Sequence, residues 1–177
     1  MALDSDNVRV AVTGAVYVAP TGTTAPTASG SALDAAFVDL GYVSADGITE
    51  AIDKSTSQIR AWQDGSLVRE IVSDGTYSLD MTFIETSEAV LELYYGSAIT
   101  SGELGVNPRA TGGRQSFVVD IIDGSAVERI YIPAGEITSV GERTLASGEA
   151  IGYNVTITAY ADASSDVATK WFSVLEG

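Results

Sequence analysis

Neither cysteine nor histidine occurs in this sequence of 177 residues. The absence of cysteine excludes disulfides and thiolate nucleophiles, and the absence of histidine removes the commonest general base and a usual zinc ligand. Cations are also scarce, because nine lysines and arginines face 24 aspartates and glutamates, which gives a net charge of −15. So few cations cannot form the basic surface that holds nucleic acid. Most enzyme mechanisms and specific DNA binding therefore lack the residues that they need.

Long apolar runs are missing as well. No stretch approaches the roughly 20 apolar residues that span a bilayer, and residues 1–7 are acidic where a signal peptide is basic. Glycine-rich phosphate loops and the ligand spacing of a calcium loop are also absent. We therefore expect a protein that stays where it is made, with no membrane role, no cofactor and no metal site.

What the sequence does contain is the alternation of apolar and polar residues that is typical of β-strands. Alternate valines from Val8 to Val18 predict a first strand with one buried face, which ends at Pro20. Asp-Gly pairs at 64–65 and 123–124 predict tight hairpins. The other expected strands are 37–43, 48–52, 54–62, 67–73, 75–85, 115–122, 126–132, 137–140, 151–159 and 169–175.

The organisation predicted from this pattern is one mainly β domain over residues 1–177. The chain has no internal repeat, and 45% of its residues are hydrophobic, which is enough for a single globular core. Two segments rich in Gly, Ser, Thr, Ala and Pro, at about 20–31 and 97–113, predict long solvent-exposed loops.

The segment 75–85 has the clearest alternation in the chain. Its apolar face consists of Tyr77, Leu79, Met81 and Phe83, and its polar face of Thr76, Ser78, Asp80 and Thr82. A period of two with this contrast predicts one face in the core and one in contact with water.

One helix is predicted over residues 86–95. Thr86 can cap its N-terminus and Gly96 can end it. Its apolar stripe consists of Ala89, Val90, Leu93 and Tyr94. Because a helix of this length is not stable alone, the stripe must dock on the sheet. Leu91 and Tyr95 lie on another side and are candidates for a contact with a neighbouring molecule.

The residues by themselves leave three functions open. Trp62, Trp171 and the tyrosines could stack on sugar rings, although we favour core and interface anchors. A carboxylate pair could hydrolyse glycosides, but an acidic solvated surface explains the same residues without chemistry. The pattern therefore fits an assembling structural protein, an Ig-like or carbohydrate-binding surface module, or, as the least favoured reading, a glycosidase.

Several segments, taken in order, resemble one known family. They are Asn7-Val-Arg-Val-Ala-Val-Thr-Gly-Ala-Val-Tyr-Val-Ala-Pro20, Phe37-Val-Asp-Leu-Gly-Tyr-Val-Ser44, Asp46-Gly-Ile-Thr-Glu50, Ile59-Arg-Ala-Trp-Gln-Asp-Gly65, Phe83-Ile-Glu-Thr86 and Leu91-Glu-Leu-Tyr-Tyr-Gly96. Together they resemble the major tail tube proteins of long-tailed, siphovirus-type bacteriophages that infect actinobacteria. The resemblance covers about residues 7–175.

The resemblance implies a fold and a function. The fold is a β-sandwich or barrel of the phage tail tube type with one flanking α-helix at about 86–95. The function is that of a structural virion protein, made in the host cytoplasm, whose hexameric rings stack into a tail tube. Genome DNA passes through this tube during ejection without specific binding. The implied partners are further copies of the chain and the tape measure, tail terminator and baseplate proteins. No enzyme activity is implied.

The resemblance also suggests roles for two sets of residues. The polar face Thr76, Ser78, Asp80 and Thr82 is either an ordinary solvent face, which we favour, or the lining of the tube. Small hydroxyls and acids suit a lining, because lysine or arginine would hold DNA phosphates by releasing counterions. The candidates for contacts between subunits are Arg60, Trp62, Asp64, Leu91 and Tyr95.

Overall fold

The computed structural model describes residues 7–161 and 166–175, and over these ranges the protein is mainly β with a single α-helix, as predicted. In chain order the elements are β1 Thr13–Pro20, β2 Val38–Asp39, β3 Val43–Arg60, β4 Leu67–Phe83, α1 Glu88–Tyr95, β5 Ile99–Thr100, β6 Glu103–Leu104, β7 Gln115–Asp123, β8 Ala126–Val140, β9 Tyr153–Ala159, β10 Thr169–Phe172 and the 3-10 helix η2 Ser173–Leu175. Among these described residues, no helix combines the length and the apolar character that crossing a bilayer requires.

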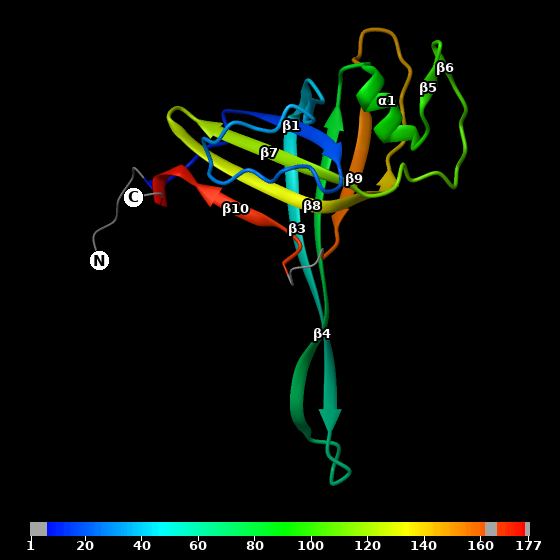
Figure 1. Cartoon of the computed structure of the whole chain (residues 1–177). Coiled ribbons are helices and arrows are strands. Elements are labelled where there is room, and N and C mark those ends of the chain that lie inside the picture. Colours follow the sequence, from blue (N-terminus) through cyan, green and yellow to red (C-terminus); the bar gives the residue numbers. More distant parts are fainter. Residues whose placement is uncertain (1–6, 162–165, 176–177) are drawn as a thin grey trace.

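Eight strands form one antiparallel sheet in the order β2-β1-β7-β8-β9-β4-β3, and β10 pairs with β8 off this path. The long strand β8 pairs with β7 up to Gly135 and with β9 from Gly135 onward, so the sheet bends there. A Cβ on Gly135 would lie 2.7 Å from a Phe117 ring carbon and 2.9 Å from an Ile157 methyl, so only glycine fits at the bend. In Figure 1, β1, β7 and β8 consequently run across β9, β4 and β3. Because β2 and β3 do not pair with each other, the sheet remains open.

The two halves of the bent sheet face each other across one hydrophobic core. Its most deeply buried members include Val16, Leu40, Leu79, Met81, Phe83, Phe117, Ile130, Ile132, Tyr153, Val155 and Ile157. The predicted apolar face of 75–85 is therefore confirmed as a wall of this core. The arrangement is that of a sandwich made from a single folded sheet.

Helix α1 covers one end of the core, with Val90 and Leu93 buried, as the predicted apolar stripe requires. Its cap lies one residue later than expected. The N-cap is Ser87, whose Oγ accepts a hydrogen bond from the backbone N–H of Val90 at 3.3 Å. The Thr86 hydroxyl lies 3.1 Å from the Tyr153 hydroxyl, so Thr86 ties the helix entry to the sheet and does not cap it.

The first strand is shorter than predicted. It begins at Thr13, and Val8, Val10 and Val12 are exposed, so the expected buried face is wrong for these three valines. The reason lies in the partner strand, because Thr13 pairs with Ile122 next to the turn at which β7 ends. Residues 8–12 therefore lie beyond the strand pairing of β1, beside the β7–β8 turn, where the backbone N–H of Val10 donates to Asp123 Oδ2 at 3.2 Å.

Four predicted strands are in fact two long ones. The segments 48–52 and 54–62 belong to β3, and 67–73 and 75–85 belong to β4. Polar residues and a glycine at the apparent breaks suggested separate strands. These residues are tolerated because the distal part of this hairpin leaves the body of the molecule, where no core selects an apolar face (Figure 1).

The loop at 20–31 is not a free, solvent-exposed arm. Ser29 is buried, and the loop lies against the side of β7 and β8 that faces away from the core. It is held by Arg129, whose Nη1 donates to the Ser31 carbonyl at 2.6 Å and to the Ala28 carbonyl at 3.3 Å. Arg129 also forms a buried ion pair with Asp120. The second long loop, 97–113, contains the short hairpin β5-β6.

Candidate functional site

A two-stranded ribbon projects from the body of the molecule, formed by the distal parts of β3 and β4 (Figure 1). Strand β9 pairs with β4 only from Tyr77 to Phe83, so residues 67–76 of β4 pair with β3 alone. An isolated pair of strands is marginally stable in water. This ribbon therefore leaves backbone edges and side chains free for another molecule.

Large apolar side chains lie exposed along the ribbon and at its tip. They are Ile52, Ile59, Trp62, Leu67, Val68, Ile71 and Val72. Trp62 is 97% exposed, which is an extreme value for the side chain with the largest apolar surface. Exposed apolar groups gathered on one element mark an interaction surface.

The tip of the ribbon is ordered by its own hydrogen bonds. The Arg60 guanidinium donates to the Gly65 carbonyl at 3.2 Å and to Gln58 Oε1 at 2.9 Å. Asp64 and Gly65 both have positive φ, as the predicted Asp-Gly turn requires. Arg60 thus braces the turn, while Trp62 and Asp64 remain available on its surface.

A second surface is the polar face of β3, β4, β9 and the end of β8, on the side of the sheet away from the core. Its cross-strand rows are Asp53–Thr76, Ala51–Ser78–Thr158–Glu136, Thr49–Asp80–Thr156–Ser139 and Thr82–Asn154. No lysine or arginine stands in any of these rows. The four predicted polar residues of β4 therefore lie on a continuous face of hydroxyls, amides and carboxylates.

Asp80 is the centre of a hydrogen-bond network on this face. Its Oδ2 accepts a hydrogen bond from the Thr156 hydroxyl at 2.9 Å, and its Oδ1 accepts one from the Asn154 amide at 3.1 Å. The same amide is 3.2 Å from the Thr82 hydroxyl. Asp80 is thus held in place and is only partly exposed.

An ion cluster braces the root of the ribbon. Lys170 Nζ on β10 lies 2.7 Å from Glu50 Oε1 on β3 and 3.2 Å from Glu128 Oε1 on β8. Burial acts to raise the pKa of Glu50, but the hydrogen bond and charge of Lys170 outweigh it and lower that pKa. Burial, and next the Glu50 carboxylate, raise the pKa of the Tyr77 hydroxyl. The ribbon is therefore tied to the body by an ionised carboxylate.

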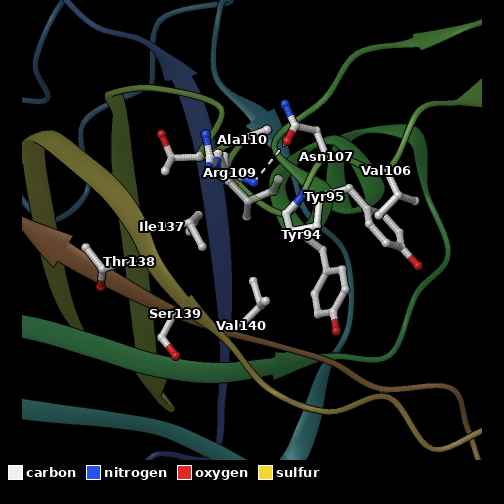
Figure 2. Close-up of a pocket in the computed structure, with 13 residues that line it drawn as sticks. Tyr94, Tyr95, Val106, Asn107, Arg109, Ala110, Ile137, Thr138, Ser139 and Val140 are labelled. Carbon is white, nitrogen blue, oxygen red and sulfur yellow. Dashed lines mark hydrogen bonds between the residues drawn. The ribbon is translucent and has the colours of Figure 1, made fainter.

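A pocket of about 350 Å³ lies beside α1 (Figure 2). Its lining includes Tyr94 and Tyr95 from the helix, Val106 and Arg109 from the following loop, and Val140 at the end of β8. The two tyrosine rings pack edge to face, with centroids 4.9 Å apart. Among the residues that the structure describes, no group of three or more carboxylates could hold a metal ion.

The sequence matches the family model described as phage tail tube protein over residues 1–174. The chain belongs to this phage tail tube family. None of the curated proteins matches it.

Two solved structures share its fold. The first is a chain of an extracellular contractile injection system, the PVC sheath-tube complex in the extended state, with a TM-score of 0.52 and 8% identity over 94% of this chain and 93% of that one. The second is a chain of the anti-feeding prophage cap, the AFP tube terminating cap, with a TM-score of 0.50 and 13% identity over 98% of this chain and 100% of that one. At these identities the likeness concerns the fold alone.

The predicted contact residues of this tail tube chain fall in two distant places. Arg60, Trp62 and Asp64 share the ribbon tip, whereas Leu91 and Tyr95 are on α1. Leu91 packs partly against the chain's own core. Tyr95 is partly exposed, and its hydroxyl accepts a hydrogen bond from Arg143.

Sequence reasoning missed three cations that organise these surfaces, namely Arg129, Arg143 and Lys170. Asp120, the ion partner of Arg129, lies only nine residues away, directly opposite it on the predicted 115–122/126–132 hairpin, so the hairpin register could have paired them. The Ala28 and Ser31 carbonyls bound by Arg129, and the Glu50 and Glu128 partners of Lys170, are 42 to 120 residues away, and spacing along the chain could not pair them. A further signal was their scarcity, because a rare cation of an acidic chain has to find an anion or a ring when it is partly buried.

Proposed function

We propose that this chain is the structural subunit of a phage tail tube and acts as one tail tube domain over residues 1–177. Copies assemble into hexameric rings, the rings stack into a tube, and genome DNA passes through it during ejection. The partners are other copies, the tape measure protein, and the terminator and baseplate proteins. The protein is made in the host cytoplasm and resides in the virion tail, in a long-tailed phage of an actinobacterial host. It has no enzymatic activity.

The projecting ribbon is the observation that carries this proposal. A two-stranded element with open edges and exposed apolar side chains is stable and soluble over the long term only when another chain covers it. The family and the tube-type fold support a second copy of this chain as that partner. Arg60, Trp62, Asp64, Leu91 and Tyr95 are the proposed contact residues.

Electron microscopy of the purified protein at high concentration tests this function. We expect six-fold rings and stacked tubes. Monodisperse particles that never assemble would contradict it. Because Trp62 is exposed, an Ig-like or carbohydrate-binding module is the second candidate, and monomers that bind glycans would favour it.

The polar face with Thr76, Ser78, Asp80 and Thr82 is the proposed lining of the tube. Its rows contain hydroxyls and acids but no cation, so DNA phosphates find no counterion-releasing contact there. Repulsion from the carboxylates extends only about 8 Å at physiological salt, which keeps DNA off the wall without blocking its passage.

Thr76→Lys tests the lining more cleanly than a change at Asp80, because Thr76 is exposed and Asp80 accepts two side-chain hydrogen bonds. We expect T76K virions to assemble and to eject DNA several-fold more slowly. The matched control is Thr24→Lys, at an exposed position of the loop on the other half of the sheet. Equal ejection rates for the two variants, or a tube reconstruction with Thr76 outside, would remove this face as the lining.

A further inference from the structure

The ribbon tip and the pocket beside α1 lie at opposite ends of β4. The tip precedes Leu67, the first residue of this strand, and α1 begins at Glu88, shortly after its last residue, Phe83. A strand of 17 residues spans about 55 Å at the usual rise per residue. Figure 1 shows the tip and the helix at the two extremes of the molecule. An exposed tryptophan at one end of the molecule is thus accompanied by a pocket at the other end.

We propose that Trp62 of one subunit inserts into the pocket formed by Tyr94, Tyr95, Val106, Arg109 and Val140 of a second copy in the next ring. This inference rests on the proposed tube function and specifies which surfaces join successive rings.

The chemistry of the pocket suits an indole. Its wall combines the two tyrosine rings with Val106, Val140 and Pro108, and aromatic rings favour edge-to-face or offset contacts with a further ring. The volume of about 350 Å³ is at the lower end of natural small-ligand pockets, which is the size for one large side chain.

The pocket wall is already rigid before any partner arrives. The Tyr94 hydroxyl donates to the Gly141 carbonyl at 2.6 Å, and the Tyr94 ring also packs against Tyr153. Arg143 donates to the Tyr95 hydroxyl and lies over the Tyr153 ring, with its guanidinium carbon 4.9 Å from the ring centroid. Pre-ordered rings lose little entropy on binding, which favours their use as an anchor site.

The charges at the two ends are complementary. Asp64 is exposed beside Trp62 at the tip, and Arg109 is exposed on the pocket lining (Figure 2). Neither side chain forms an ion pair among the residues that the structure describes. Arg109 is one of only nine cations in the chain, and its charge at the pocket favours binding of a tip that carries Asp64.

Symmetry favours stacking over pairing. When the ribbon tip of one molecule binds the pocket at the far end of an identical molecule, the contact is head-to-tail and repeats without limit along one direction. Each subunit then uses its tip once and its pocket once. Tip-to-tip contact, by contrast, would close after two rings.

Trp62→Ala is the first test. Loss of a buried tryptophan anchor should raise the critical concentration for tube growth at least about 30-fold, whereas single rings should persist. Trp62→Phe should lose less, and Tyr42→Ala, which removes another exposed aromatic ring at a distance from the tip, should leave tube growth unchanged. Circular dichroism checks that each variant is folded. Tube growth of W62A equal to that of Y42A would overturn the inference but not the tube function. Wild-type protein that forms neither rings nor tubes would overturn the tube function itself.

Cross-linking is the second test, and it is specific because the chain has no cysteine of its own. Gln63→Cys marks the tip and Val106→Cys marks the pocket, and both positions are exposed. With a short bis-maleimide, tubes of the double variant should give a ladder that extends well beyond dimers on a denaturing gel. Each single variant can give dimers at most. A double variant that shows only the products of the single variants would place the tip outside the pocket.

Discussion

Arg129→Met tests the buried ion pair that holds the 20–31 loop on the sheet. Arg129 is 6% exposed and Asp120 is 8% exposed. The Nε and Nη2 atoms donate to the two Asp120 oxygens at 2.6 and 2.7 Å, and Nη1 donates to the Ser31 carbonyl at 2.6 Å. Methionine fills a similar space but donates nothing. The Asp120 carboxylate then stays buried without its arginine.

The size of the effect follows from that stranded charge. Removal of one partner of a buried ion pair costs about 3–5 kcal/mol of unfolding free energy. For a chain of this length the loss lowers the Tm by about 6–20 °C. The double variant R129M/D120V removes the stranded charge as well and leaves mainly the loop carbonyls without their donor, at about 1–3 kcal/mol. The single variant should therefore be less stable than the double variant.

Urea unfolding of the dilute subunit, followed by far-ultraviolet circular dichroism, gives both free energies. Limited proteolysis provides a second readout, because a released loop at 20–31 should be cut faster in both variants than in the wild type. An R129M subunit within about 1 kcal/mol of the wild type, or a double variant as unstable as the single one, would refute the assignment of the pair as the anchor of the loop.

Two further predictions concern the ribbon root and the helix start. Because Lys170 lowers the pKa of Glu50, the stability from this pair is fully present above the unfolded pKa of 4.5 and is lost as the pH falls through the lower folded pKa. Glu50→Gln should remove this part of the acid dependence, which is worth less than about 1 kcal/mol for so exposed a pair. Urea midpoints measured between pH 6 and pH 3 check this. A Glu50→Gln variant whose midpoints fall with pH as steeply as those of the wild type would contradict the role of Lys170. Ser87→Ala should cost about 1 kcal/mol by removing the cap on the N–H of Val90, and a Tm equal to that of the wild type would show that Ser87 is not the cap.

The parts of the fold that sequence predicts well are those where burial alternates. Strand β4 from Tyr77 to Phe83 is correct because each apolar residue faces the core and each polar one faces outward. The helix is correct to within two residues because a stripe of four apolar residues ends at Gly96, whose positive φ stops it. In both elements the local pattern and the tertiary environment require the same residues.

The turn of the ribbon was predicted from Asp64-Gly65, with strands at 54–62 and 67–73, but the continuation of these strands into the body was not, because nothing covers the ribbon within one subunit. Outside the body there is no buried face, so residues such as Asp53 and Gly75 stand inside long strands and look like breaks. The packing of the 20–31 loop was missed for a related reason. It depends on one arginine about a hundred residues away that bonds to backbone carbonyls, and backbone acceptors have no sequence signature.

The length of the ribbon places its exposed contact surface far from the acidic body, whose charge repels other subunits. A net charge of −15 keeps subunits apart, but at physiological salt this repulsion fades over about 8 Å. The part of β4 that pairs with β3 alone, residues 67–76, extends for about 33 Å at the usual strand rise. In the proposed assembly, Trp62 at that distance from the acidic body reaches a second copy before the two bodies repel each other. The same charge that makes the free subunit soluble therefore need not oppose the first contact of assembly.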